Sequence, residues 1–109
     1  MNIETCDIVV QRFWNLESAL AEELFQLKYE NSKVKYILNP LDYAQDPHIN
    51  FLKKCLSGHR RVMFVGLNPG PWGMCQTGIP FGDVGQCKHF LNVTGLIWNW
   101  EQHFTEYDI

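Results

Sequence analysis

Hydrophobic positions recur with a helical period near the start of the chain. Over residues 12–30, apolar side chains follow one another at steps of three and four, and most of the glutamates lie off that line. The apolar positions are Phe13, Leu16, Leu20, Leu24 and Leu27. This pattern predicts an amphipathic helix whose leucine face packs against the core of the protein.

A second helix is predicted over residues 47–56. Asp46 can cap free backbone N–H groups at its start, and Pro47 already has the helical φ that the first turn requires. Ile49, Leu52 and Leu56 give this segment one apolar face. A glycine at position 58 is suited to stop the helix.

Two apolar runs have the character of β-strands. Residues 34–38 form the first run, which Asn39-Pro40 ends, and residues 61–67 form the second. The second is continuously apolar, which is typical of a strand covered on both faces in a parallel sheet. A further short helix is expected after Asp83, whose side chain can cap it. Helices alternating with strands predict an α/β fold.

The loop between the second run and the last helix has an unusual composition. The stretch 62–84 reads VMFVGLNPGPWGMCQTGIPFGDV; it opens in the second apolar run, continues as the loop, and contains five glycines and three prolines before Asp83. A glycine-rich loop behind a buried strand marks a place where backbone approaches a ligand, and parallel sheets bind ligands at the carboxyl ends of their strands. The loop matches neither the GxGxxG nor the GxxxxGK[ST] pattern, and it has no GxSxG elbow. Phosphate cradling and covalent catalysis are therefore not favoured.

Composition limits the class of protein. The chain has 109 residues, of which 46% are hydrophobic and 19% charged, as in one ordinary globular domain. No apolar run is long enough to span a bilayer, and the start of the chain has neither a secretory nor a transit signal, so we expect an intracellular protein. The four cysteines at positions 6, 55, 75 and 87 form no CxxC pair, so we expect reduced thiols and no metal.

A formal net charge of -3 disfavours a protein that grips nucleic acid with its whole surface. A local basic patch is still compatible with this charge. Its candidates are Lys53, Lys54, His59, Arg60 and Arg61. The simpler interpretation is that these side chains are the solvated end of a helix and of a loop.

The nineteen residues GLNPGPWGMCQTGIPFGDV resemble the first catalytic motif of the single-strand-selective monofunctional uracil-DNA glycosylases, within the uracil-DNA glycosylase superfamily. The resemblance covers roughly residues 13–96 and includes Asn39-Pro40, Tyr43-Ala44 and Pro47-His48. It implies base excision repair in the nucleus by a monomer without cofactor or metal. The reaction would be hydrolysis of the N-glycosidic bond of uracil and 5-substituted uracils in single- and double-stranded DNA. The implied fold is an incomplete three-layer α/β/α sandwich with a parallel sheet.

The resemblance assigns a catalytic role to Asn68. This residue falls at the family's catalytic asparagine, whose amide would orient the attacking water beneath the sugar and act by positioning. The alternative is that Asn68 only forms an Asx-turn before Pro69.

The resemblance also implies four substrate-binding residues. Phe81 aligns with the aromatic on which the flipped base stacks, an interaction worth about 1 to 3 kcal/mol; alternatively, it is a core phenylalanine. Leu67 falls where backbone contacts the base. Gly70 would leave room for a water or a 5-substituent, and Met74 would supply an apolar wall.

A second motif of the family, with a base-reading asparagine and a histidine beside a proline, has no counterpart here. None of His48, His59, His89 and His103 lies in that context, and each is expected to be a surface or hydrogen-bonded side chain. We therefore predict the N-terminal part of a glycosylase domain over residues 1–97 and a divergent tail over 98–109. A truncated isoform or incomplete gene product is the hypothesis that follows, and less than full activity is expected.

Two alternatives remain. The chain is a non-catalytic base- or nucleic-acid-binding fragment, such as an inactive isoform, or it does not fold alone because an apolar strand edge is exposed.

Overall fold

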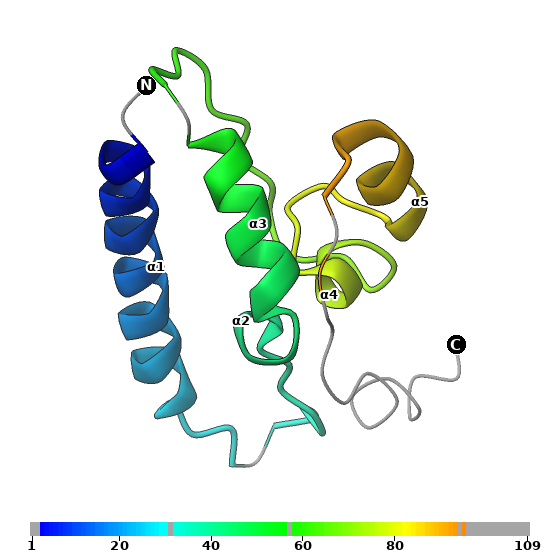
Figure 1. Ribbon diagram of the computed structural model, residues 1–109. Coiled ribbons are helices and arrows are strands. Elements are labelled where there is room, and N and C mark those ends of the chain that lie inside the picture. The colour runs from blue at the N-terminus through cyan, green and yellow to red at the C-terminus, as the bar shows by residue number, and fades with distance from the viewer. Residues whose placement is uncertain (1–2, 31, 57, 94, 96–109) are drawn as a thin grey trace.

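Two helices that lie side by side form the frame of the molecule (Figure 1). The computed structural model describes residues 3–30, 32–56, 58–93 and 95. The first helix of the pair, α1, spans Ile3–Phe25, and the second, α3, spans Gln45–Cys55. The prediction of a helix near the start of the chain is thus confirmed, although the helix begins and ends earlier in the chain than the apolar pattern indicates.

The face that α1 turns toward α3 is not the predicted leucine face. Val10 is buried, and Trp14 and Glu17 are half-buried against α3. Leu16, in contrast, is 72% exposed, and the other positions of the predicted apolar face are also open to solvent. The prediction was wrong because the described residues provide no apolar surface opposite that face, whereas His48 on α3 provides a polar partner for Glu17.

The connection between the two long helices contains one short helix. This helix, α2, spans Pro40–Tyr43 and is capped by Asn39, whose side-chain oxygen accepts a hydrogen bond from the Leu41 N–H at 3.1 Å. A single residue, Ala44, separates α2 from α3, which begins two residues before the predicted start and has no side-chain cap. Gly58 has a φ of 75°, the left-handed conformation expected just beyond a helix end.

Short helices lie within the glycine-rich stretch 62–84 and directly after it (Figure 1). They are α4 (Met74–Thr77), α5 (Val84–Gln86) and the π-helical turn η1 (Cys87–Leu91). Asp83 caps α5 by accepting a hydrogen bond from the Gln86 N–H at 3.0 Å, which confirms the predicted cap. A small hydrophobic core forms around this part of the chain from Ile79, Cys87 and Val93, with Phe51 and Leu91 packed against it.

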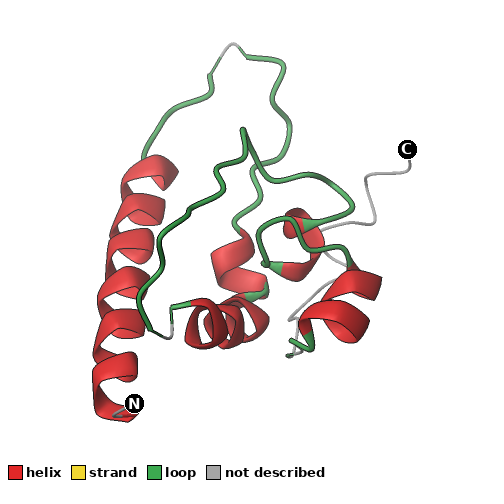
Figure 2. Cartoon of the chain, turned by 90° about the horizontal axis from the view of Figure 1, so that it is seen from above, coloured by secondary structure: helices red, strands yellow, loops and turns green. Residues whose placement is uncertain are grey.

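The predicted parallel sheet is not present. Figure 2 shows helices and loops only, and neither 34–38 nor 61–67 is a strand among the residues that the structure describes. Both predicted strands are exposed: Tyr36 is 50% exposed and Phe64 is 83% exposed. A strand is stabilised by hydrogen bonds and side-chain pairs with a neighbouring strand, so apolar, β-branched sequence alone does not produce one. The α/β/α sandwich prediction was wrong for this chain.

Two other predictions concern the C-terminal tail and membrane-spanning helices. The tail predicted over 98–109, and His103 within it, lie outside the described residues. None of the helices in the described ranges combines the length and the apolar character that crossing a membrane requires.

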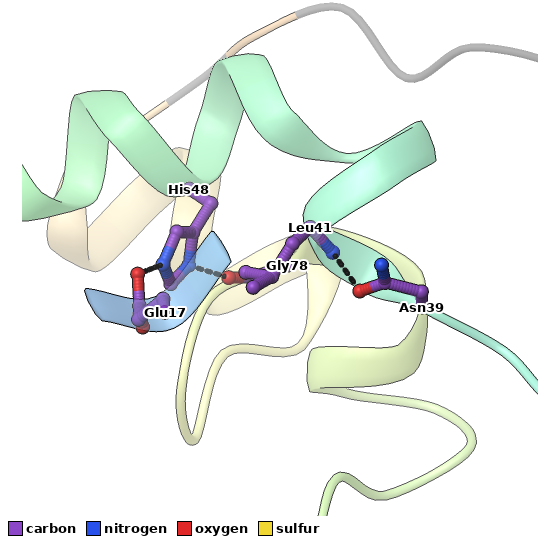
Figure 3. Close-up of polar contacts among 5 residues, drawn as sticks. All are labelled: Glu17, Asn39, Leu41, His48 and Gly78. Atoms are coloured by element: carbon purple, nitrogen blue, oxygen red, sulfur yellow. Dashed lines mark hydrogen bonds and ion pairs between the residues drawn. The ribbon is translucent and has the colours of Figure 1, made fainter. Parts of the chain in front are cut away.

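A buried histidine joins α1, α3 and the glycine-rich loop (Figure 3). His48 is 1% exposed, and its Nδ1 lies 2.6 Å from the carbonyl oxygen of Gly78. Its Nε2 lies 2.7 Å from a carboxylate oxygen of Glu17. Because a carbonyl only accepts hydrogen bonds, Nδ1 is the donor there, and a protonated imidazolium also donates from Nε2 to the carboxylate. The predicted hydrogen-bonded role of this histidine is confirmed.

The partners of His48 change its pKa. Burial by itself lowers the pKa of the imidazole, but the hydrogen bonds to Glu17 and to the Gly78 carbonyl, with the charge of Glu17, raise the pKa above its ordinary value. A group whose pKa is raised on folding binds its proton more tightly in the folded chain. It therefore stabilises the fold fully below the unfolded pKa, and this contribution is lost as the pH rises through the folded pKa.

We predict that the protein becomes less stable as the pH rises from about 6, just below the ordinary histidine pKa, through the raised pKa of His48. The reason is that the His48 imidazolium then loses its proton and no longer donates to both Glu17 and Gly78. Thermal unfolding followed by circular dichroism at half-unit pH steps measures the effect as a falling Tm.

Two variants show whether His48 causes that fall. Glu17→Gln should destabilise the protein by about 1.5 to 3 kcal/mol at pH 6, the usual range for a hydrogen bond to a charged group, and should flatten the Tm profile. His89→Gln, which removes an exposed histidine, should leave the profile unchanged. An unaltered slope in Glu17→Gln, or a lost slope in His89→Gln, would contradict the assignment.

Candidate active site

The glycine-rich loop encloses a cavity of about 540 Å³. All of the residues predicted to act on substrate line this single cavity, and they come from the loop and from the first turn of α4. They are Leu67, Asn68, Gly70, Met74 and Phe81. The structure thus brings together side chains and backbone that the motif spreads over fifteen positions of the sequence (67–81).

The loop is fixed to the helices below it at two places. The Tyr43 hydroxyl, from α2, donates a hydrogen bond to the carbonyl of Cys75 in α4. Gly78 ends α4 with a φ of 69°, and a Cβ at this glycine would lie 2.7 Å from the Ala44 carbonyl oxygen. Only glycine fits that contact and that backbone conformation. The carbonyl of Gly78 also accepts a hydrogen bond from His48, so His48 holds the loop at the end of α4.

The Thr77 side chain holds the turn that follows α4. Thr77 is 5% exposed, and its hydroxyl lies 2.7 Å from the Gly82 carbonyl oxygen, to which it donates. The Thr77 hydroxyl oxygen in turn accepts a hydrogen bond from the Ile79 N–H at 3.1 Å. The turn is closed by a bond of 2.9 Å from the Gly82 N–H to the Ile79 carbonyl. Phe81 therefore lies within a turn braced from inside by one buried hydroxyl.

Phe81 has a strained backbone and an exposed ring. Its φ is 59°, in the left-handed region that bulky side chains avoid, and its side chain is 70% exposed. Such a conformation costs about 1 to 3 kcal/mol and is kept only where the surrounding structure imposes it. The alternative of a core phenylalanine is not what the structure has, because the ring lies at the cavity rather than in the hydrophobic core.

Asn68 lies on the exposed side of the loop beside Leu67, which is fully exposed. Within the described residues no hydrogen bond involves the Asn68 side chain, so the Asx-turn suggested as its alternative role is not formed there. The Asn68 amide thus lines the cavity without a hydrogen-bond partner among the described residues. It can therefore donate to and accept from a bound water or substrate.

Trp72 and Asp83 also line the cavity, although the family resemblance assigns neither of them a role. Trp72, 62% exposed, brings a second aromatic side chain to the same cavity as Phe81. Asp83 lies at the start of α5, where one carboxylate oxygen is already used to cap the helix. Trp72 and Asp83 both belong to the glycine-rich stretch 62–84. The glycine content of that stretch was the only feature of the sequence that indicated a site shared with Asn68.

Cysteine and metal chemistry are not favoured by the described residues. Cys55, Cys75 and Cys87 are free thiols, and burial raises the pKa of the Cys75 thiol, which keeps it protonated near neutral pH. In the ranges that the structure describes, no group of three or more His, Cys, Asp or Glu side chains could hold a metal ion.

The basic residues after α3 have structural partners. Lys54 donates to the carbonyl of Leu91, and Arg60 donates from Nε to the Cys55 carbonyl at 2.8 Å. These contacts satisfy carbonyl groups at the end of α3 and of η1. The simpler interpretation of the basic cluster therefore fits these two side chains.

Comparison with known proteins connects this cavity to a family. The chain is 42% identical to a mouse single-strand selective monofunctional uracil DNA glycosylase, 40% identical to the rat protein of that description and 38% identical to the bovine one. Each comparison extends over 89 residues, or 82% of this chain. The chain is a homologue of the single-strand selective monofunctional uracil-DNA glycosylases.

The match to these glycosylases is partial in one respect. The chain spans 32%, about a third, of the length of the mouse, rat and bovine relatives. No family model matches the chain. The resemblance predicted from the GLNPGPWGMCQTGIPFGDV motif is confirmed over the 89 matched residues, which correspond to 32% of each relative.

We predict that Thr77→Val destabilises the protein by about 1 to 3 kcal/mol, because the Gly82 carbonyl and the Ile79 N–H lose a buried partner. Urea unfolding measures the change in the free energy of unfolding. Thr77→Ser, which keeps the hydroxyl, is the matched control and should lose less than half as much. Equal losses in the two variants would show that the methyl group matters rather than the hydrogen bonds.

Proposed function

We propose that this chain carries the water-positioning and base-stacking half of a uracil-DNA glycosylase site. The observation that supports it is the cavity: the motif residues that the family resemblance singles out line one hollow of about 540 Å³. Relatives named as uracil-DNA glycosylases, about 40% identical to the chain, point to DNA repair as the process. The target nucleotide would have to leave the base stack to enter the cavity.

The proposed reaction is hydrolysis of the bond between the base and C1′ of deoxyribose. A water held by the Asn68 amide forms a bond from its oxygen to C1′ and gives up one proton; the C1′–N bond breaks with its electron pair leaving on the base, and the base takes up one proton in turn. Asn68 has no titratable group, so it contributes by orienting the water. The base would stack on Phe81, with Met74 as an apolar wall and open space beside Gly70 for a 5-substituent.

The proposed substrates are uracil and 5-substituted uracils in single- or double-stranded DNA. The proposed hydrolysis uses no cofactor and no metal, and one copy of the chain forms the cavity. Repair of nuclear DNA implies that the protein acts in the nucleus.

A second candidate function is base binding without cleavage. The observation that favours it is the exposed apolar stretch 62–67, which lacks neighbouring strands among the described residues. A chain with this stretch uncovered provides one wall of a site and can hold a base while lacking groups that stabilise the departing base.

We expect Asn68→Ala to reduce the rate of uracil release by about 100-fold, the usual scale for a misplaced or missing positioning group. The assay uses the purified 109-residue chain and an oligonucleotide with one uracil, in which abasic sites are revealed by alkaline strand cleavage.

Asn15→Ala is the matched control, because Asn15 is exposed on α1 and contacts Gln11 rather than the cavity. Its rate should equal that of the unaltered chain. Binding of the uracil oligonucleotide without any cleavage would favour the second function. Equal rates for Asn68→Ala and the unaltered chain would remove Asn68 from the mechanism.

A further inference from the structure

The ring of Phe81 lies against the backbone of Gly66. A Cβ placed on Gly66 would be 3.2 Å from Cζ and 3.3 Å from Cε1 of Phe81. These distances are shorter than ordinary contacts between carbon atoms, which lie near 3.5 to 4.0 Å. A methyl group on residue 66 would therefore displace the tip of the ring by a few tenths of an ångström, whereas glycine leaves the ring in its present position.

A second glycine of the same cavity differs in this respect. A Cβ placed on Gly70 would have no heavy atom within 4 Å. Neither Gly66 nor Gly70 is among the described glycines with positive φ, which are Gly58 and Gly78. Both positions therefore accept an L side chain on backbone grounds, and what distinguishes Gly66 is the aromatic ring beside it.

The contact matters because little else fixes the ring. Phe81 is 70% exposed and lies outside the hydrophobic core, and its backbone is held at a φ of 59° by the turn around Thr77. The turn determines where the Phe81 side chain leaves the backbone. The lack of a side chain at Gly66 determines how closely the tip of the Phe81 ring can lie to the backbone of residue 66. The place of the aromatic surface in the cavity depends on both.

We propose that Gly66 is a positioning residue, which sets the place of the Phe81 ring and, through it, the place of a stacked pyrimidine base. The part that concerns the base rests on the proposed function. Gly66 does not act on the base itself: it acts by lacking a side chain where the ring tip lies.

The position of the ring is tested first, without any ligand. An aromatic ring shifts the NMR signals of nearby protons, so the Gly66 amide proton should move in Phe81→Leu, whose side chain has no aromatic ring. In Gly66→Ala the NMR signals of the Phe81 ring protons should shift, whereas in Gly70→Ala these signals should be unchanged. Absence of an effect of Phe81→Leu on the Gly66 amide would overturn the proposal.

The second test measures how tightly the unaltered chain and the variants bind free uracil, by following NMR chemical shifts during titration. Gly66→Ala should weaken binding by about tenfold, within the range expected for a disturbed stacking contact. In the Phe81→Leu background the same substitution should have no further effect, because the leucine side chain ends before the clash. Equal effects of Gly66→Ala in both backgrounds would show that Gly66 acts independently of Phe81.

Far-UV circular dichroism of each variant shows whether it keeps the helices of the unaltered chain, and Phe81→Leu is the variant to rely on if Gly66→Ala loses them. If the unaltered chain binds no uracil, the proposed function fails, and the ring-proton shifts alone decide whether Gly66 sets the position of Phe81. If uracil binds but Phe81→Leu binds equally well, stacking is excluded and so is a role for Gly66 in placing the base.

Discussion

The double hydrogen bond of His48 is the interaction on which the described structure most depends. One imidazole joins Glu17 of α1, its own helix α3 and the Gly78 carbonyl at the end of α4. The hydrophobic core is small and lies around Ile79, away from α1, so α1 relies on this polar bridge and on the packing of Val10 and Trp14. Buried polar groups of this kind contribute strongly only when every donor and acceptor is satisfied, and both ring nitrogens of His48 are.

The same bridge connects the frame to the cavity. Gly78 is where α4 stops, and the turn braced by Thr77 begins one residue after it, at Ile79. The path from α1 to Phe81 thus runs through hydrogen bonds between groups that are largely buried, with no long hydrophobic interface. A loop lined by glycines keeps a defined shape here because Tyr43, His48 and Thr77 each hold one of its carbonyl groups.

Local chemistry was predictable from the sequence, and tertiary partners were not. Asp83 was expected to cap a helix and does, since a cap needs only residues within one turn. The motif residues were expected to act together, and they line one cavity, though their roles remain predictions. The leucine face of α1 and the strand at 61–67 failed for one reason: each pattern indicates that a surface is to be covered, not what covers it. The chain spans only 32% of its relatives, and within the described residues neither surface has a partner.

The left-handed backbone of Phe81 creates a conflict between folding and binding. Glycine adopts a φ of 59° without strain, so a glycine at this position would relax the turn and make the fold easier to keep. It would also remove the only described aromatic ring that rests on Gly66. At this position the residue that suits the backbone and the residue that brings an aromatic ring to the cavity are therefore different, and the chain has the second at a cost in backbone strain of about 1 to 3 kcal/mol.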